Sequence, residues 1–187
     1  MSLYTETTPR FFDLGHSEVA VRTFGRGPDV VFVHGWPVSS ATFRDLAPAL
    51  ADSFTCHLID LPGGPSETKV RDERAIDLGR HPETVRAVID RLELPRYAML
   101  AHDSGALITR YVAARDPERV AGLVMGNTEI PGYHPWQMTL YLAAARLPGG
   151  AALFRLLLRN RRFRNSAAAL GACFEDLERL DGEFGEL

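Results

Sequence analysis

A short turn motif near the middle of the chain carries the residue types that could do chemistry. The sequence Ala101-His102-Asp103-Ser104-Gly105 follows a short apolar run and precedes a helical pattern. A sharp turn between a strand and a helix can hold one side chain above the end of a parallel sheet, where it can act as a nucleophile. A simple helix cap is the alternative, since Asp and Ser are common capping residues.

The sizes of the neighbouring residues indicate which side chain of this turn is the nucleophile. Such a turn is so tight that the positions two before and two after the nucleophile must be small. Asp103 meets this condition with Ala101 and Gly105, whereas Ser104 would have the bulky His102 two positions before it. We therefore interpret Asp103 as a carboxylate nucleophile that attacks carbon and becomes an ester.

A second motif, His34-Gly35-Trp36-Pro37, occurs about seventy residues earlier, at the end of another apolar run. Gly35 lets the backbone approach a ligand closely, and Pro37 fixes the geometry after Trp36. A backbone N–H of this turn can then point into the space beyond the strand ends. Taken alone, the motif could also be an ordinary loop in which His34 is structural. The two motifs together predict an active site.

With these motifs, the chain resembles the α/β-hydrolase superfamily, and within it the aspartate-nucleophile branch of epoxide hydrolases and dehalogenases. The family elbow Gly-His-Asp-X-Gly is matched by residues 101–105, with His102 and Gly105 in supporting positions. The family motif HGXP is matched by residues 34–37. The resemblance implies an oxyanion hole made by the backbone N–H groups of Trp36 and Ser104. It extends over residues 18–127.

Alternating strand and helix patterns predict an α/β fold. Strands are expected at residues 10–14, 18–24, 30–33, 54–59, 97–100 and 120–125, and helices at residues 81–92, after residue 105 and in a segment ending near residue 51. Pro48 means that this last helix either starts late or is kinked. Continuous apolar runs are typical of parallel strands that are buried on both faces. We therefore expect a mostly parallel sheet with helices on both faces and a site at the carboxyl ends of its strands.

Proline and glycine punctuate the chain from Ile130 onward, between segments with helical spacing at residues 136–146, 151–158 and 166–180. Because the resembled family inserts a helical cap after the corresponding strand, we assign residues 1–130 to the hydrolase core and 131–187 to a partial cap. The family places its histidine base and acid after the cap, but the last histidine here is His134. We expect that the C-terminal core strands are missing and that turnover fails after the ester forms.

The expected substrate class follows from the resemblance and a few side chains. Dehalogenases usually place a halide-binding Trp or Arg directly after the nucleophile, whereas this chain has Ser104. Epoxide hydrolases use cap tyrosines to protonate the opening epoxide, and Tyr133 and Tyr141 lie in the predicted cap, although either could equally be a core residue. Opening of a small apolar epoxide is therefore the leading prediction. Haloalkane dehalogenation comes next, then ester hydrolysis through Ser104. A non-catalytic module that binds a ligand or a partner is the alternative from another class.

Composition and charge argue against several other classes. A formal charge of -3 gives no reason to expect nucleic acid or a membrane as a partner, and the arginines of residues 155–164 are interpreted as a solvated face. Cys56 and Cys173 have no metal-ligand spacing, which predicts a cytoplasmic protein without a metal or another cofactor. No stretch approaches the length of a membrane span. If residues 120–125 form an exposed sheet edge, self-association is expected.

Overall fold

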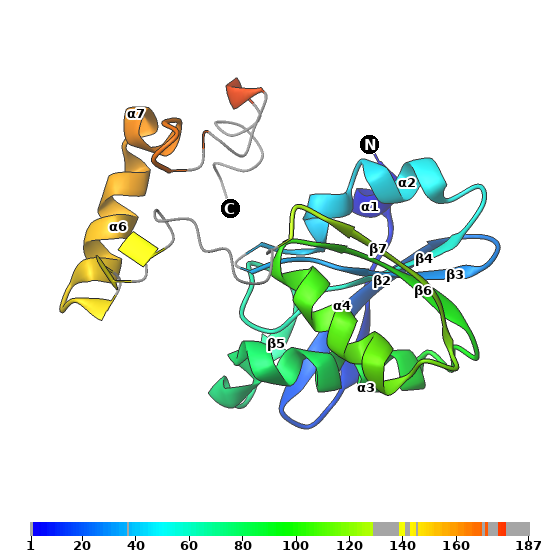
Figure 1. Ribbon diagram of the computed structural model, residues 1–187. Coiled ribbons are helices and arrows are strands. Elements are labelled where there is room, and N and C mark those ends of the chain that lie inside the picture. Colours follow the sequence, from blue (N-terminus) through cyan, green and yellow to red (C-terminus); the bar gives the residue numbers. More distant parts are fainter. Residues whose placement is uncertain are drawn as a thin grey trace. The chain divides into compact units, whose positions relative to one another are not determined.

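Two units make up the chain, residues Met1–Glu129 and Ile130–Leu187. The computed structural model describes residues 2–36, 38–128, 139–140, 143–144, 146–169, 171 and 176–178. Figure 1 shows the helices and strands of both units.

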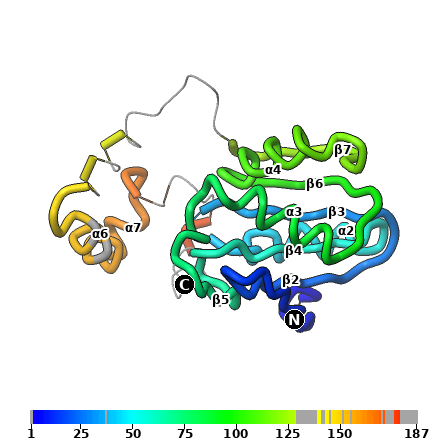
Figure 2. Tube along the Cα trace, turned by 90° about the horizontal axis from the view of Figure 1, so that it is seen from below, coloured from blue at the N-terminus to red at the C-terminus, as the bar shows by residue number. Residues whose placement is uncertain are grey.

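A seven-stranded sheet organises the first unit (Figures 1 and 2). Its path runs in the order β1-β2-β4-β3-β6-β7, and β5 pairs with β2. The strands are β1 (Arg10–Asp13), β2 (Ser17–Gly25), β3 (Asp29–Val33), β4 (Thr55–Ile59), β5 (Lys69–Val70), β6 (Tyr97–His102) and β7 (Val120–Gly126). The strands β4, β3, β6 and β7 are parallel, whereas β2 runs antiparallel to its three neighbours. The predicted α/β fold is confirmed, with a sheet that is mixed.

Helices cover both faces of this sheet. Helices α3 (His81–Arg91) and α4 (Ser104–Arg115) lie on one face, and α1 (Leu3–Glu6) and α2 (Leu46–Leu50) lie on the other (Figure 1). Side chains alternate along β6, as a strand requires. Tyr97, Met99 and Ala101 belong to the core cluster that also contains α3 and α4 residues, while Leu100 packs against the smaller cluster that includes α2. Because β4, β3, β6 and β7 are parallel neighbours, their carboxyl ends all lie at the same end of the sheet.

The helix between β3 and β4 starts late, which is one of the two outcomes expected from Pro48. The segment contains a 3-10 helix, η1 (Ser40–Phe43), followed by α2. Two further 3-10 helices, η2 (Glu73–Ile76) and η3 (Leu78–Arg80), precede α3. Pro48 is the third residue of α2, where a missing N–H breaks no bond within the helix. The expected end of the helix near residue 51 is also confirmed.

The second unit contains α6 (Gly150–Arg159) and α7 (Arg161–Arg164). Helix α6 agrees with the pattern at residues 151–158, and the rings of Phe154 and Phe163 pack edge to face at 6.3 Å. Residues 166–169 form turns rather than the start of the expected helix. The pattern at residues 136–146 lies mostly outside the described residues, and the assignment as a cap stays a prediction. Within the described ranges, no helix combines the length and apolarity that a bilayer span requires.

Candidate active site

A strained turn places Asp103 between β6 and α4. Strand β6 ends at His102 and α4 begins at Ser104, so a single residue makes the whole connection. Its dihedral angles are φ 56° and ψ -134°, a backbone conformation that non-glycine residues rarely adopt. Such strain persists only where the surroundings impose it, and it is concentrated at functional sites. The Asp103 side chain is exposed at the carboxyl edge of the parallel strands.

Close backbone packing explains why small residues flank Asp103. Ala101 is only 1% exposed. A Cβ atom on Gly105 would lie 2.2 Å from the carbonyl oxygen of Val33 and 2.7 Å from that of His34. Any side chain at position 105 would therefore push the start of α4 away from the end of β3. The size requirement used to choose Asp103 over Ser104 has this physical origin.

Gly35 brings the loop after β3 against the carboxylate. A Cβ atom on this residue would lie 2.6 Å from both Cβ and Oδ1 of Asp103. Only a glycine leaves room for the Asp103 side chain at this distance. The two sequence motifs, sixty-eight residues apart at Gly35 and Asp103, are thus in direct contact.

The two backbone donors expected to form an oxyanion hole both lie at this turn, but they do not share an acceptor. The Ser104 N–H donates to Asp103 Oδ1 at 2.5 Å. The Trp36 N–H donates to the Ser104 hydroxyl oxygen at 2.9 Å. Oδ1 is therefore held by one donor, and the second donor is occupied by a side chain whose role the sequence did not reveal. The other carboxylate oxygen, Oδ2, accepts no hydrogen bond within the described part of the chain.

His34 is a structural side chain that joins two strand ends. It is 2% exposed. Its Nε2 accepts the N–H of Leu61 at 2.9 Å, so its Nδ1 carries the proton and donates to the carbonyl oxygen of Gly35 at 2.7 Å. Burial lowers its pKa below the usual value. The motif histidine therefore supports the loop after β3 and is engaged at both ring nitrogens.

The remaining predicted site residues are less informative. His102 is half-buried, and its Nδ1 has no hydrogen-bond partner in the described part of the chain. None of the five described histidines hydrogen-bonds Asp103, and no described group of three or more His, Cys, Asp or Glu side chains is arranged to hold a metal ion. Pro37, Tyr133 and Tyr141 lie outside the described residues.

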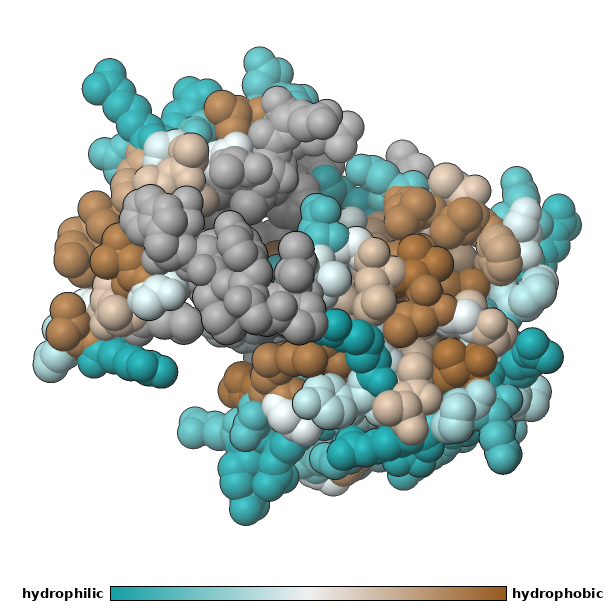
Figure 3. All heavy atoms as spheres, viewed as in Figure 1, coloured by the Kyte–Doolittle hydropathy of each residue, from teal (hydrophilic) through white to brown (hydrophobic). Residues whose placement is uncertain are grey.

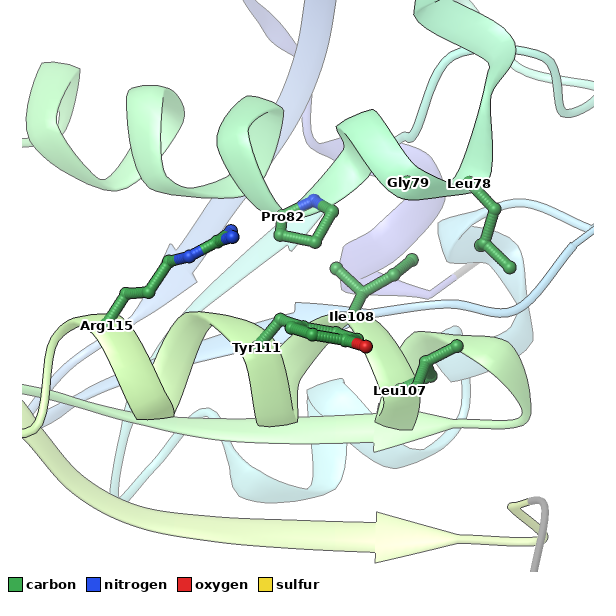
Figure 4. A pocket seen from close by; sticks show the side chains of 7 residues that line it. All are labelled: Leu78, Gly79, Pro82, Leu107, Ile108, Tyr111 and Arg115. Atoms are coloured by element: carbon green, nitrogen blue, oxygen red, sulfur yellow. The ribbon is translucent and has the colours of Figure 1, made fainter. Parts of the chain in front are cut away.

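A groove of about 340 Å³ lies apart from this turn, between the start of α3 and the outer face of α4 (Figure 4). Its lining is formed by Leu78, Gly79, Pro82, Leu107, Ile108, Tyr111 and Arg115. None of the motif residues contributes to it. The groove is therefore not the space into which the Asp103 carboxylate faces.

His81 is a second buried histidine that makes the stability of the chain depend on pH. His81 is 1% exposed, and burial, followed by the nearby His34, lowers its pKa. The carbonyls of Pro62 and Ala75 partly oppose this shift, although neither ring nitrogen forms a hydrogen bond of normal geometry with a described residue. The folded chain therefore binds a proton at His34 and His81 less readily than the unfolded chain, in which a histidine has its usual pKa of about 6.5.

We expect the free energy of unfolding to decrease as the pH falls from 7.5 to 5.5. Below the unfolded pKa, each buried histidine contributes a slope of up to about 1.4 kcal/mol per pH unit. Replacing His81 by leucine should reduce the slope, and urea denaturation at several pH values measures it. At pH 7.5, the difference in the free energy of unfolding between this variant and the wild-type chain measures the change in packing alone. An unchanged slope in the variant would show that His81 is not the source.

Comparison with known proteins places these features in a family. The family model described as "alpha/beta hydrolase fold" matches residues 28–180. Haloalkane dehalogenase 2 of Mycobacterium tuberculosis strain H37Rv is 35% identical over 120 residues, which are 64% of this chain and 41% of that protein. Pimeloyl-[acyl-carrier protein] methyl ester esterase of Aeromonas hydrophila is 32% identical over 125 residues, or 63% of this chain and 47% of the relative. The chain spans about half the length of these curated relatives.

Solved structures agree with this result. An alpha/beta hydrolase fold protein from Burkholderia ambifaria matches 79% of this chain and 56% of its own, with a TM-score of 0.64 and 28% identity. The haloalkane dehalogenase DbeA from Bradyrhizobium elkani matches 83% of this chain and 55% of its own, with a TM-score of 0.68 and 25% identity.

Proposed function

Because the chain belongs to the alpha/beta hydrolase fold family, we propose that it is a hydrolase-type protein whose Asp103 carboxylate attacks a small apolar epoxide. The observation that carries the proposal is the strained turn at Asp103, with Oδ1 held by the Ser104 N–H and Oδ2 left to react. Trp36 is 58% exposed next to this turn, and its indole ring offers an apolar surface to the substrate.

The first half-reaction needs the carboxylate as its nucleophile and a proton donor for the opened ring. A lone pair on Oδ2 forms a bond to an epoxide carbon, the carbon–oxygen bond of the ring breaks, and the resulting alkoxide takes a proton. Tyr133 and Tyr141 are the proposed substrate-binding residues that supply it, and water is the other source. The product is an ester between Asp103 and the opened substrate.

The second half-reaction is hydrolysis of this ester. Water attacks the carbonyl carbon of Asp103, and the negative charge develops on Oδ1. The N–H groups of Ser104 and Trp36 are the donors that would stabilise it, and one such donor typically changes the rate on the order of 100 to 1,000-fold. This step also needs a base, and no described histidine is bonded to Asp103. We therefore propose that the ester accumulates on this chain.

A haloalkane is the second candidate substrate, because a haloalkane dehalogenase is among the relatives. Halide would then leave from carbon as Oδ2 attacks. Ester hydrolysis through Ser104 is less well supported, since the Ser104 hydroxyl accepts the Trp36 N–H and none of the five described histidines is bonded to it. A chain that only binds a ligand or a partner, without chemistry, is the remaining alternative.

Intact mass spectrometry tests the proposal. The chain is incubated with styrene oxide or with 1-bromobutane, and its mass is compared with that of untreated chain. A mass increase equal to one opened epoxide supports the epoxide, and an increase equal to one butyl group supports the haloalkane. If circular dichroism shows a folded chain and neither reagent adds mass, the proposed attack by Asp103 is wrong, which leaves ester hydrolysis through Ser104 and the non-catalytic alternative.

Ser104 is expected to slow the second half-reaction through its hydroxyl. Replacing Ser104 by alanine frees the Trp36 N–H, which can then join the Ser104 N–H on Oδ1. We expect the ester to break down roughly 10- to 100-fold faster, which is less than the full effect of one oxyanion donor. The half-life of the adduct, followed by intact mass, measures this. Ser104→Thr keeps the hydroxyl and is the control, and equal half-lives in the alanine and wild-type chains would disprove the effect.

A further inference from the structure

Asp60 is a buried carboxylate that the two half-reactions described above do not use. It directly follows β4 and is only 2% exposed. The surface of the first unit carries many hydrophilic side chains, drawn in teal in Figure 3, and the surface is the usual place for a charged residue. Burial of a charge is costly unless hydrogen bonds and an opposite charge compensate it. The partners of Asp60 therefore show what this carboxylate holds in place.

Each carboxylate oxygen of Asp60 has a partner of its own. Oδ1 accepts the N–H of Ser40 at 2.8 Å, and Ser40 is fully buried. Oδ2 lies 3.4 Å from Nη1 of Arg22, which compensates the charge. The backbone of Asp60 is also fixed, because its N–H donates to the carbonyl oxygen of Ala20 and its carbonyl oxygen accepts the Thr68 hydroxyl. Asp60 is thus a rigidly held acceptor for the Ser40 N–H.

Two adjacent residues after β4 hold both ends of the loop that follows β3. At the start of this loop, the Leu61 N–H donates to Nε2 of His34 at 2.9 Å. At its end, the Asp60 carboxylate accepts the Ser40 N–H. Trp36 lies between these two bonds, and its N–H is one of the two donors of the proposed oxyanion hole. The position of this donor therefore depends on both attachments.

Close packing further restricts the same loop. A Cβ atom on Gly64 would lie 2.3 Å from the carbonyl oxygen of Val38, so the loops after β3 and β4 are in backbone contact. The Tyr4 hydroxyl lies 3.0 Å from the Ser40 hydroxyl. All of these contacts are formed inside the first unit. The placement of the loop therefore does not depend on any other part of the chain.

We propose that Asp60 is the positioning residue for the Trp36 N–H in ester hydrolysis, an inference that rests on the proposed function. Without the bond to Ser40, the loop keeps its attachment at His34 but loses the one at its other end. The Trp36 N–H then no longer points to where charge develops on Asp103 Oδ1. A misplacement of about 1 Å can cost on the order of 100-fold in rate. The attack of Asp103 on the substrate does not use this N–H and is the reference step.

A cycle of double variants tests the inference. Ser104→Ala is expected to speed ester breakdown roughly 10- to 100-fold, because it frees the Trp36 N–H. In chains that also carry Asp60→Ala, we expect this acceleration to fall below about 3-fold, because the freed donor is misplaced. Asp60→Asn keeps an oxygen for the Ser40 N–H and should retain most of the acceleration. Adduct half-lives, followed by intact mass spectrometry, measure all three effects.

Asp116→Ala is the matched control, because it removes a carboxylate that is also hydrogen-bonded and ion-paired. Asp116 accepts the Tyr97 hydroxyl at 2.8 Å and pairs with Arg119, at the opposite end of the strands from the loop. It should lower stability and leave the acceleration by Ser104→Ala intact. Equal loss of acceleration in the Asp60→Ala and Asp116→Ala chains, or no loss in either, would overturn the inference.

Amide hydrogen exchange separates failure of this inference from failure of the proposed function. We expect slow exchange at Ser40 in the wild-type chain, and exchange at least about 10-fold faster at Ser40 and Trp36 in Asp60→Ala. Asp116→Ala should leave both rates unchanged. If the wild-type chain forms no adduct, the proposed function fails and these exchange rates alone decide whether Asp60 positions the loop.

Folding of the variants is checked by circular dichroism. If Asp60→Ala does not fold, Asp60→Ser takes its place, because its polar side chain is one bond shorter and ends too far from the Ser40 N–H. A Ser40 N–H that exchanges as fast as an exposed amide in the folded wild-type chain would overturn the inference without any variant.

Discussion

Replacing Asp103 by asparagine is expected to abolish covalent modification of the chain by an epoxide. The amide oxygen can still accept the Ser104 N–H, which holds Oδ1 in the wild-type chain, so the turn should keep its geometry. The amide is a far weaker nucleophile than the carboxylate, and loss of a nucleophile typically lowers a rate by at least about 1,000-fold. The initial rate of adduct formation, followed by intact mass spectrometry, measures the effect.

Two comparisons make this result interpretable. Thermal unfolding shows whether the asparagine variant is folded, and the Ser104→Ala variant shows whether the hydroxyl contributes. We expect Ser104→Ala to form the adduct at a rate close to that of the wild-type chain. If the asparagine variant reacts as fast as the wild-type chain, the nucleophile lies elsewhere.

Gly105→Ala is expected to be the most destabilising single-methyl change in the site. The added Cβ would lie 2.2 Å from the Val33 carbonyl oxygen, which is backbone at the centre of the sheet and cannot move cheaply. A steric conflict of this kind typically costs at least ~3 kcal/mol, a large share of the stability of a domain. Urea denaturation measures the change in the free energy of unfolding.

Gly122→Ala is the matched control for this change. A Cβ atom at position 122 meets nothing within 4 Å, so the substitution should change stability by less than about 1 kcal/mol. If both variants are equally stable, the start of α4 is free to move away from β3. The close packing that holds Asp103 in its strained conformation would then be absent.

The sequence predicted those features of the fold that depend on local patterns. The apolar runs at residues 30–33 and 97–100 are buried parallel neighbours, and the helical spacing at residues 81–92 corresponds to α3. The small residues on either side of Asp103 predicted a tight turn, because the size of each side chain can be read directly from the sequence. Such patterns reflect the periodicity of burial, and burial dominates the choice of structure.

Other features depend on contacts that no local pattern contains. The bond from the Trp36 N–H to the Ser104 hydroxyl requires two loops sixty-eight residues apart to meet with one particular side-chain rotamer. The protonated ring nitrogen of His34 is set by the Leu61 N–H, which belongs to a different strand end. The 3-10 helix η1 before α2 was not predicted, although Pro48 indicated that the helix in this segment either starts late or is kinked.

The most direct test of the central claim is to locate the covalent adduct by fragmentation of the peptide that contains residues 97–115. Asp103 and Ser104 are adjacent, so fragment ions that separate them identify the reacting side chain without ambiguity. Our account predicts that wild-type chain treated with an epoxide carries the added mass on Asp103. An adduct on Ser104, or on any other residue while Asp103 stays unmodified, would contradict it.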